Sequence, residues 1–115
     1  MPDYKQKLAA LMEVVVSQGA SDLHLGEGVQ PMVRVSGTLA PILSEQVLAR
    51  ADMEGLLAQM LSPEQHKRFT DTQEVDFSYA HGDKARFRGN GFVERGRYAV
   101  ALRLIPRAIR SLAEL

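Results

Sequence analysis

The feature that most constrains the fold is a strict alternation of apolar and polar residues near the end of the sequence. The apolar members of residues 97–106 stand at every second position: Tyr98, Val100, Leu102 and Leu104. A second β-like stretch, residues 84–93, precedes them and is separated only by Glu94-Arg95-Gly96. Successive side chains of a strand point to opposite faces, so this pattern predicts two antiparallel strands that turn one face toward a core.

The rest of the sequence predicts further strands and three helices. The other strands are expected over residues 22–25, 31–35, 38–43 and 75–79, and the helices over residues 3–18, 50–61 and 62–70. Pro41 indicates that its strand is short or lies at a sheet edge. Most turns between neighbouring strands are short, which favours antiparallel pairing. The predicted fold is therefore α+β, with a mostly antiparallel sheet of about six strands and helices packed on one face.

Length and composition exclude several classes of protein. A chain of 115 residues fits one domain with one modest core. The absence of cysteine excludes disulfides and thiolate chemistry. The first residues do not resemble a signal peptide, and no apolar run approaches the ~20 residues of a membrane helix. These observations predict a soluble, cytoplasmic domain.

Charge is divided unevenly along the sequence although the net charge is zero. Residues 1–83 carry 6 Lys/Arg and 12 Asp/Glu, whereas residues 84–115 carry 8 Lys/Arg and 2 Asp/Glu. Such a division suggests that the basic part meets an anion or an acidic partner. The alternative is that the two parts neutralise each other across one sheet.

Alternation also places four arginines on the outward face of the two final strands. They are Arg86, Arg88, Arg97 and Arg103. Phe87 and Gly89 face the other way, toward the predicted core. Arginine presents a planar fork that suits phosphate or carboxylate oxygens. The alternative is a solvated outer face whose charge is balanced by Asp76 or Glu94.

Other kinds of chemistry find little support in the sequence. No G-x-x-x-x-G-K-[ST] phosphate loop is present. Asp22 and His24 share a strand face, but two ligands are too few for a closed metal site. His66 and His81 are expected to be isolated. Nucleic-acid binding is not expected, because Phe87 faces the core and the net charge is zero.

Three groups of residues together resemble the N-terminal part of PilT-like pilus retraction ATPases. The first is Gly19-Ala20-Ser21-Asp22-Leu23-His24-Leu25, and the second is the hairpin pattern Gly28-x-x-Pro31-x-x-Arg34-x-x-Gly37-x-Leu39. The third comprises Asp76-Phe77-Ser78, Ala85-Arg86-Phe87-Arg88-x-Asn90-x-Phe92 and Leu102-Arg103-x-Ile105-Pro106. These motifs follow one another in the family's order and cover nearly the whole chain.

The resemblance implies a PAS-like N-terminal domain over residues 1–110. Residues 111–115 would then begin the linker to a RecA-like ATPase domain that carries the phosphate loop. Members of the family form homo-hexameric rings at the cytoplasmic face of the inner membrane, where they act with a pilus platform protein in twitching motility. ATP and Mg would belong to the full-length parent, and no cofactor or metal to this chain. The alternatives are the equivalent domain of a type II secretion or pilus assembly ATPase, and a free-standing PAS-like sensory or ligand-binding module.

The resemblance also assigns roles to individual residues. Contact with the nucleotide phosphates, made jointly with the motor domain, is expected of Arg86, Arg88, Arg103 and Arg97. An inter-domain or structural role is expected of Asp22, His24, Arg34 and Asn90. Gly89 and Gly91 depart from the family, in which bulkier residues flank the asparagine, and they predict a weakened strand or a bulge.

Overall fold

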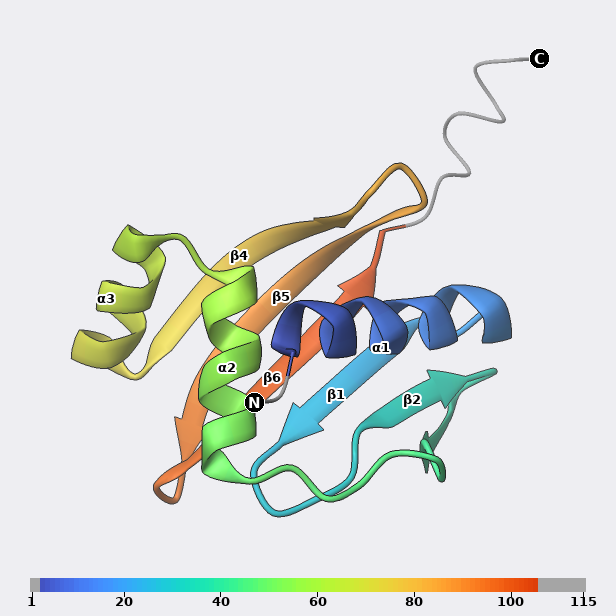
Figure 1. Cartoon of the computed structure of the whole chain (residues 1–115), viewed down its shortest axis with the longest axis horizontal. Coiled ribbons are helices and arrows are strands. Elements are labelled where there is room, and N and C mark those ends of the chain that lie inside the picture. The colour runs from blue at the N-terminus through green and yellow to red at the C-terminus, as the bar shows by residue number, and fades with distance from the viewer. Residues whose placement is uncertain (1–2, 106–115) are drawn as a thin grey trace.

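A computed structural model describes residues 3–105, in which three helices pack on one face of a six-stranded sheet (Figure 1). The elements are α1 (Tyr4–Gln18), β1 (Asp22–Gly26), β2 (Met32–Val35), β3 (Thr38–Pro41), α2 (Arg50–Met60), α3 (Pro63–Thr72), β4 (Glu74–His81), β5 (Ala85–Glu94) and β6 (Arg97–Leu104). The predicted α+β class and antiparallel sheet are confirmed. The predicted linker, residues 111–115, lies outside the described residues.

The strands are arranged in the order β3-β2-β1-β6-β5-β4, and every neighbouring pair is antiparallel. β6 is the last strand in the chain, yet it lies between β1 and β5. It therefore joins an N-terminal set of three strands to a C-terminal pair. β3 forms one edge of the sheet, as Pro41 predicts, and it is two residues shorter than the predicted strand.

The helix ends follow from local sequence signals. The side chain of Asp3 accepts a hydrogen bond from the Gln6 amide at 3.1 Å and begins α1, and Gly19 ends it with a φ of 64°. Ser62 and Gln65 form a capping box at the start of α3. Within residues 3–105, none of the helices is long and apolar enough to cross a membrane.

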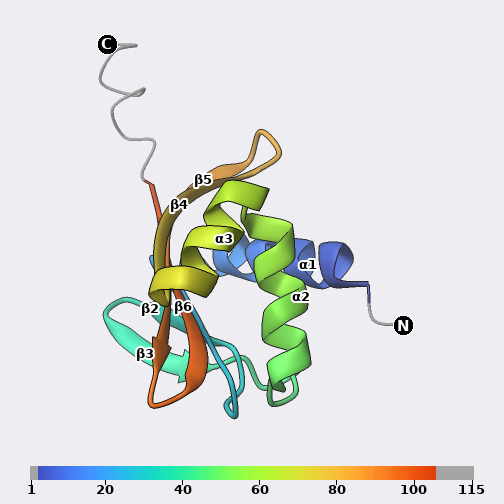
Figure 2. The same cartoon turned by 90° about the vertical axis from the view of Figure 1, so that its left-hand side faces the viewer.

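The core lies between the helices and one face of the sheet (Figure 2). Leu23, Phe87 and Leu102, from three central strands, are at most 1% exposed. α1 contributes the fully buried side chains Leu8, Leu11, Met12 and Val15. No helix within residues 3–105 covers the opposite face of the sheet, which we call the open face.

Gly89 does not produce the predicted bulge or break in β5. Residues 85–94 pair without interruption with β4 on one side, and residues 87–94 pair likewise with β6 on the other. The ring of Phe77 lies directly over Gly89, so a Cβ at this position would stand 2.3 Å from the Phe77 Cζ atom. The glycine thus makes room for an aromatic core residue in a regular strand.

The prediction that His81 is isolated is wrong. Its Nε2 atom lies 2.6 Å from the Oε2 oxygen of Glu13, and Lys84 donates to the same oxygen at 2.8 Å. These contacts join α1 to the turn between β4 and β5. The paired residues are separated by 68 and 71 positions in the sequence, so no local pattern predicts these contacts.

This contact gives the domain a pH-dependent contribution to stability. Hydrogen bonds from Lys84 and His81 hold the pKa of the Glu13 carboxyl below its ordinary value of 4.5. A pKa that is lowered by folding means that ionised Glu13 stabilises the fold above 4.5, and that this contribution disappears as pH falls through the folded-state pKa. Glu13→Gln is therefore expected to lower the urea midpoint near neutral pH and to match the unaltered chain at strongly acidic pH.

Glu54→Gln is the matched control for this prediction. Glu54 is an exposed carboxylate on α2 that no ion pair joins to a cation within residues 3–105. Its substitution is expected to change the urea midpoint little at any pH. A Glu13→Gln deficit of the same size at neutral and acidic pH would contradict the assignment.

Candidate functional site

The open face carries a row of charged side chains across four neighbouring strands. In register, Arg34 of β2 stands beside Asp22 of β1, Asp22 beside Arg103 of β6, and Arg103 beside Arg88 of β5. Side chains that face each other across strands have Cβ atoms about 4.5–5.5 Å apart. We call these four residues the charged row. Arg86 lies two positions from Arg88 on the same face of β5.

Three of the four arginines predicted to gather are therefore brought together. They are Arg86, Arg88 and Arg103, and all three are exposed. Arg97 is on the same face but six positions from Arg103, which corresponds to about 20 Å along a strand. It lies at the other end of β6, where it pairs in register with Glu94 of β5. Arg97 is thus not part of the same site.

Asp22 is the carboxylate that balances the charged row. It is 8% exposed. Its Oδ1 atom accepts from the Ser21 hydroxyl at 2.5 Å and lies 4.0 Å from the Nε of Arg34. Its Oδ2 atom lies 3.5 Å from the Nε of Arg103. The sequence-based alternative named Asp76 or Glu94 for this balancing role, and neither of them forms an ion pair within residues 3–105.

The surroundings of Asp22 keep it ionised. Burial raises the pKa of its carboxyl. The Ser21 hydrogen bond and the positive charge of Arg103 together lower the pKa by more than burial raises it, so the pKa lies below the ordinary value. A buried carboxylate with cations on both sides is stable only while those partners remain in place. Asp22 therefore forms one electrostatic group with Arg34 and Arg103.

Arg86 and Arg88 differ from Arg34 and Arg103 in their pairing. Neither forms an ion pair with a carboxylate within residues 3–105. Arg103 is held at its Nε, while 76% of its side chain stays exposed. The open face thus presents three neighbouring guanidinium groups, and two of them have no carboxylate partner in the described part of the chain. Such a group is suited to an oxyanion supplied from outside.

The remaining predicted site residues lie beside the charged row. The Asn90 side chain donates to Asp76 at 2.8 Å and to Glu74 at 3.3 Å, so it joins β5 to the edge strand β4. His24 stands between Met32 and Ala101 in register, and its buried Nε2 atom has no hydrogen-bond partner among the described residues. In the described residues, no three His, Asp or Glu side chains are grouped so that they could hold a metal ion.

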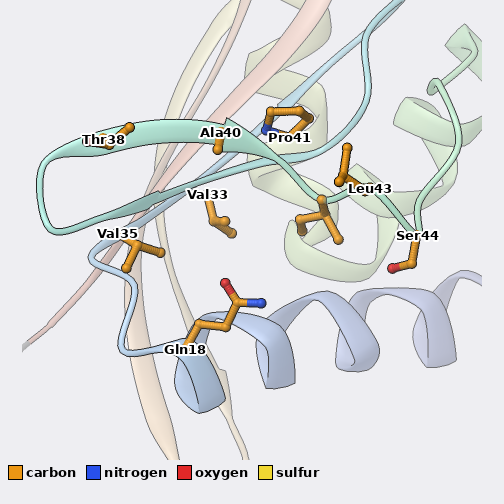
Figure 3. A pocket seen from close by; sticks show the side chains of 9 residues that line it. Gln18, Val33, Val35, Thr38, Ala40, Pro41, Leu43 and Ser44 are labelled. Atoms are coloured by element: carbon orange, nitrogen blue, oxygen red, sulfur yellow. The ribbon is translucent and has the colours of Figure 1, made fainter.

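A hollow lies at the sheet edge, between α1 and the β2–β3 hairpin (Figure 3). It is lined by Gln18 of α1, by hairpin residues that include Val33 and Thr38, and by Leu43, whose side chain is 83% exposed. A ligand-binding module needs a pocket that surrounds most of its ligand. This hollow is open to solvent at the sheet edge, so it does not support that alternative.

Comparisons with known proteins find pilus ATPases among the sequence relatives. No protein-family model matches the chain. The type IV pilus retraction ATPase PilT of Pseudomonas aeruginosa is 33% identical over 108 residues, which are 94% of this chain and 31% of PilT. The type IV pilus ATPase PilU of the same organism is 30% identical over 105 residues, 91% of this chain and 27% of PilU. The chain therefore spans about a third of the length of these relatives.

Solved structures agree with the sequence comparison. The crystal structure of the pilus retraction motor PilT with bound ADP superposes with a TM-score of 0.80 at 29% identity. The superposition covers 87% of this chain and 29% of that one. The ATPase DotB of Legionella pneumophila shares the fold with a TM-score of 0.73.

Proposed function

Because the chain is a homologue of the N-terminal domain of PilT-like pilus and secretion ATPases, we propose that it couples nucleotide binding to domain movement in a pilus retraction ATPase. The observation that carries this proposal is the group of three exposed arginines on an open sheet face. A motor domain covering this face would bring a nucleotide to these guanidinium groups, of which those of Arg86 and Arg88 have no carboxylate partner within residues 3–105. The solved PilT homologue, which was crystallised with ADP, supports a nucleotide as the anion.

The chemistry of the site suits the terminal phosphate of ATP. Phosphoryl transfer builds charge on the phosphoryl oxygens, and positioned cations stabilise that charge. Arg86, Arg88 and Arg103 supply such cations without any hydrolytic machinery of their own. The nucleotide and its Mg²⁺ would be held by the motor domain. The domain then distinguishes ATP from ADP through a phosphate that only ATP carries.

The assembly around this domain follows from the same proposal. The open face would meet the RecA-like motor domain of the same or a neighbouring subunit in a homo-hexamer. Such a ring would act at the cytoplasmic side of the inner membrane, against the pilus platform protein. The equivalent domain of a type II secretion or pilus assembly ATPase would use the open face in the same way.

The test is Arg88→Ala in the longer protein that joins this domain to its motor. ATP turnover is expected to fall about ten-fold or more, because a hydrogen bond to a charged group contributes about 1.5–3 kcal/mol. Arg88 takes part in no ion pair within residues 3–105, so its removal leaves no carboxylate unpaired there. Lys5→Ala is the control, since Lys5 is exposed on α1, which packs on the other face of the sheet. Unchanged turnover in a folded Arg88→Ala hexamer would contradict the proposed phosphate contact.

A further inference from the structure

Asp22 is the one buried charged side chain in residues 3–105. It stands between Arg34 and Arg103, whose side chains are held by different numbers of contacts. Arg34 is fixed at both ends: its Nε lies 4.0 Å from Asp22, and its Nη1 donates to the Gly37 carbonyl at 3.1 Å. Within residues 3–105, Arg103 is held only at its Nε, 3.5 Å from Asp22. The exposed fraction of the side chain is 38% for Arg34 and 76% for Arg103.

The atom through which Arg103 is held matters for what it can do. A guanidinium group has five N–H donors, of which one belongs to Nε and four to the two Nη amines. The contact with Asp22 uses the Nε side, and within residues 3–105 the Nη amines of Arg103 make no hydrogen bond. The group is therefore held on the sheet while its forked end remains available to a second anion.

Holding the arginine in advance has an energetic consequence. An arginine side chain carries about 2 kcal/mol of rotamer entropy, part of which is lost when it binds a phosphate. A side chain that is already ordered loses less, and its bond to the phosphate is correspondingly stronger. The buried carboxylate can order Arg103 because it is itself fixed, by the Ser21 hydroxyl at 2.5 Å and by the backbone of a central strand.

We propose that Asp22 is a positioning residue, which holds Arg103 by its Nε so that the Nη amines face the nucleotide phosphate. This inference rests on the proposed function and adds to it a separate role for each charged residue of the row. Arg34 neutralises Asp22 and anchors it to the hairpin. Arg103 is presented by Asp22, whereas Arg88 and Arg86 act without a carboxylate.

Asp22 also has an effect that the experiment needs to separate from positioning. It is an anion close to an anion site, so Asp22→Asn alone removes a repulsion and favours phosphate binding. That electrostatic effect is the same whether or not Arg103 is present, whereas positioning acts only through Arg103. A double-mutant cycle isolates the second effect.

The experiment measures the factor by which Arg103→Gln lowers ATP turnover in the longer protein, with Asp22 intact and with Asp22→Asn. We expect about a ten-fold loss when Asp22 is intact and a factor near one in the Asp22→Asn background. Equal factors in both backgrounds would overturn the proposal. Lys5→Gln is the control, since Lys5 is an exposed cation on α1, which packs on the other face of the sheet, and it forms no ion pair within residues 3–105. Its factor is expected to stay near one in both backgrounds.

A second variant avoids any disturbance of the buried carboxylate. Arg103→Lys keeps the positive charge at an exposed position, but its ammonium group lacks the planar fork that directs one donor toward Asp22 and two others toward a phosphate. Turnover is expected to fall as far as in Arg103→Gln, and full turnover in Arg103→Lys would refute positioning.

The outcomes also separate this inference from the proposed function. If Arg88→Ala lowers turnover while Arg103→Gln does not, the phosphate site stands and the positioning role of Asp22 fails. If neither substitution lowers turnover, the proposed function fails and the inference fails with it. In the 115-residue chain, the Nε–H resonance of Arg103 is expected to shift on Asp22→Asn, whereas an unchanged resonance would exclude the contact itself.

Discussion

Replacing Phe87 by alanine is expected to lower the free energy of unfolding by about 3–5 kcal/mol. Phe87 is 0% exposed and is among the largest fully buried side chains of the core. It lies in β5, which is hydrogen-bonded on both sides, so the surrounding strands cannot move in to fill the cavity. The chain contains no tryptophan, and urea unfolding followed by far-UV circular dichroism measures the effect.

Leu43→Ala is the control for this prediction. It also shortens a large apolar side chain, but Leu43 is 83% exposed, and surface substitutions usually change stability by less than about 0.5 kcal/mol. A Phe87→Ala chain as stable as Leu43→Ala would contradict the described core. Phe87 stands between Arg86 and Arg88 in sequence, so its burial also turns both arginines to the open face.

Gly89→Ala is expected to lower the free energy of unfolding by about 3 kcal/mol, although it adds a single methyl group. The new Cβ would stand 2.3 Å from the Cζ of Phe77, where atoms cannot overlap. Phe77 is only 5% exposed, so its ring cannot swing into solvent to make room. Either the ring leaves its rotamer or β5 moves away from β4, and both distort a well-packed core.

Gly91→Ala provides a close control within the same strand. Gly91 faces the same side of the sheet, but a Cβ there meets its nearest atoms at 3.5 Å, which is ordinary contact. We expect Gly91→Ala to change stability by less than about 1 kcal/mol. Adding Phe77→Leu to Gly89→Ala removes the clashing ring carbons and is expected to recover part of the loss. Equal destabilisation by the two alanines would show that the ring does not lie over Gly89.

The fold could be predicted largely from local patterns. Alternation along residues 97–104 and 85–90 identifies which side chains face the core, and a capping box or a helix-ending glycine marks helix ends such as Ser62 and Gly19. These signals lie within a few residues of the structure that they specify. The faces of Arg86, Arg88 and Arg103 were predicted correctly for this reason.

The arrangement of the site could not be predicted from such patterns. Alternation assigns a face but not a position along the strand, so Arg97 was grouped with Arg103 although they lie at opposite ends of β6. The pairing of Asp22 with Arg103 depends on β6 lying beside β1, a contact between residues 81 positions apart. A strand order is set by how helices and strands pack together, and no motif within one strand reports it.

The place of β6 in the sheet also bears on how the domain acquires its structure during synthesis. The hairpin of β1 and β2 leaves the ribosome early, but one edge of β1 stays unpaired until β6, the last strand, has followed. Closing so long a loop is slow compared with forming a hairpin. The two halves of the sheet therefore gain a common core only when the last strand arrives, and with it the carboxylate and the arginine of the charged row meet for the first time.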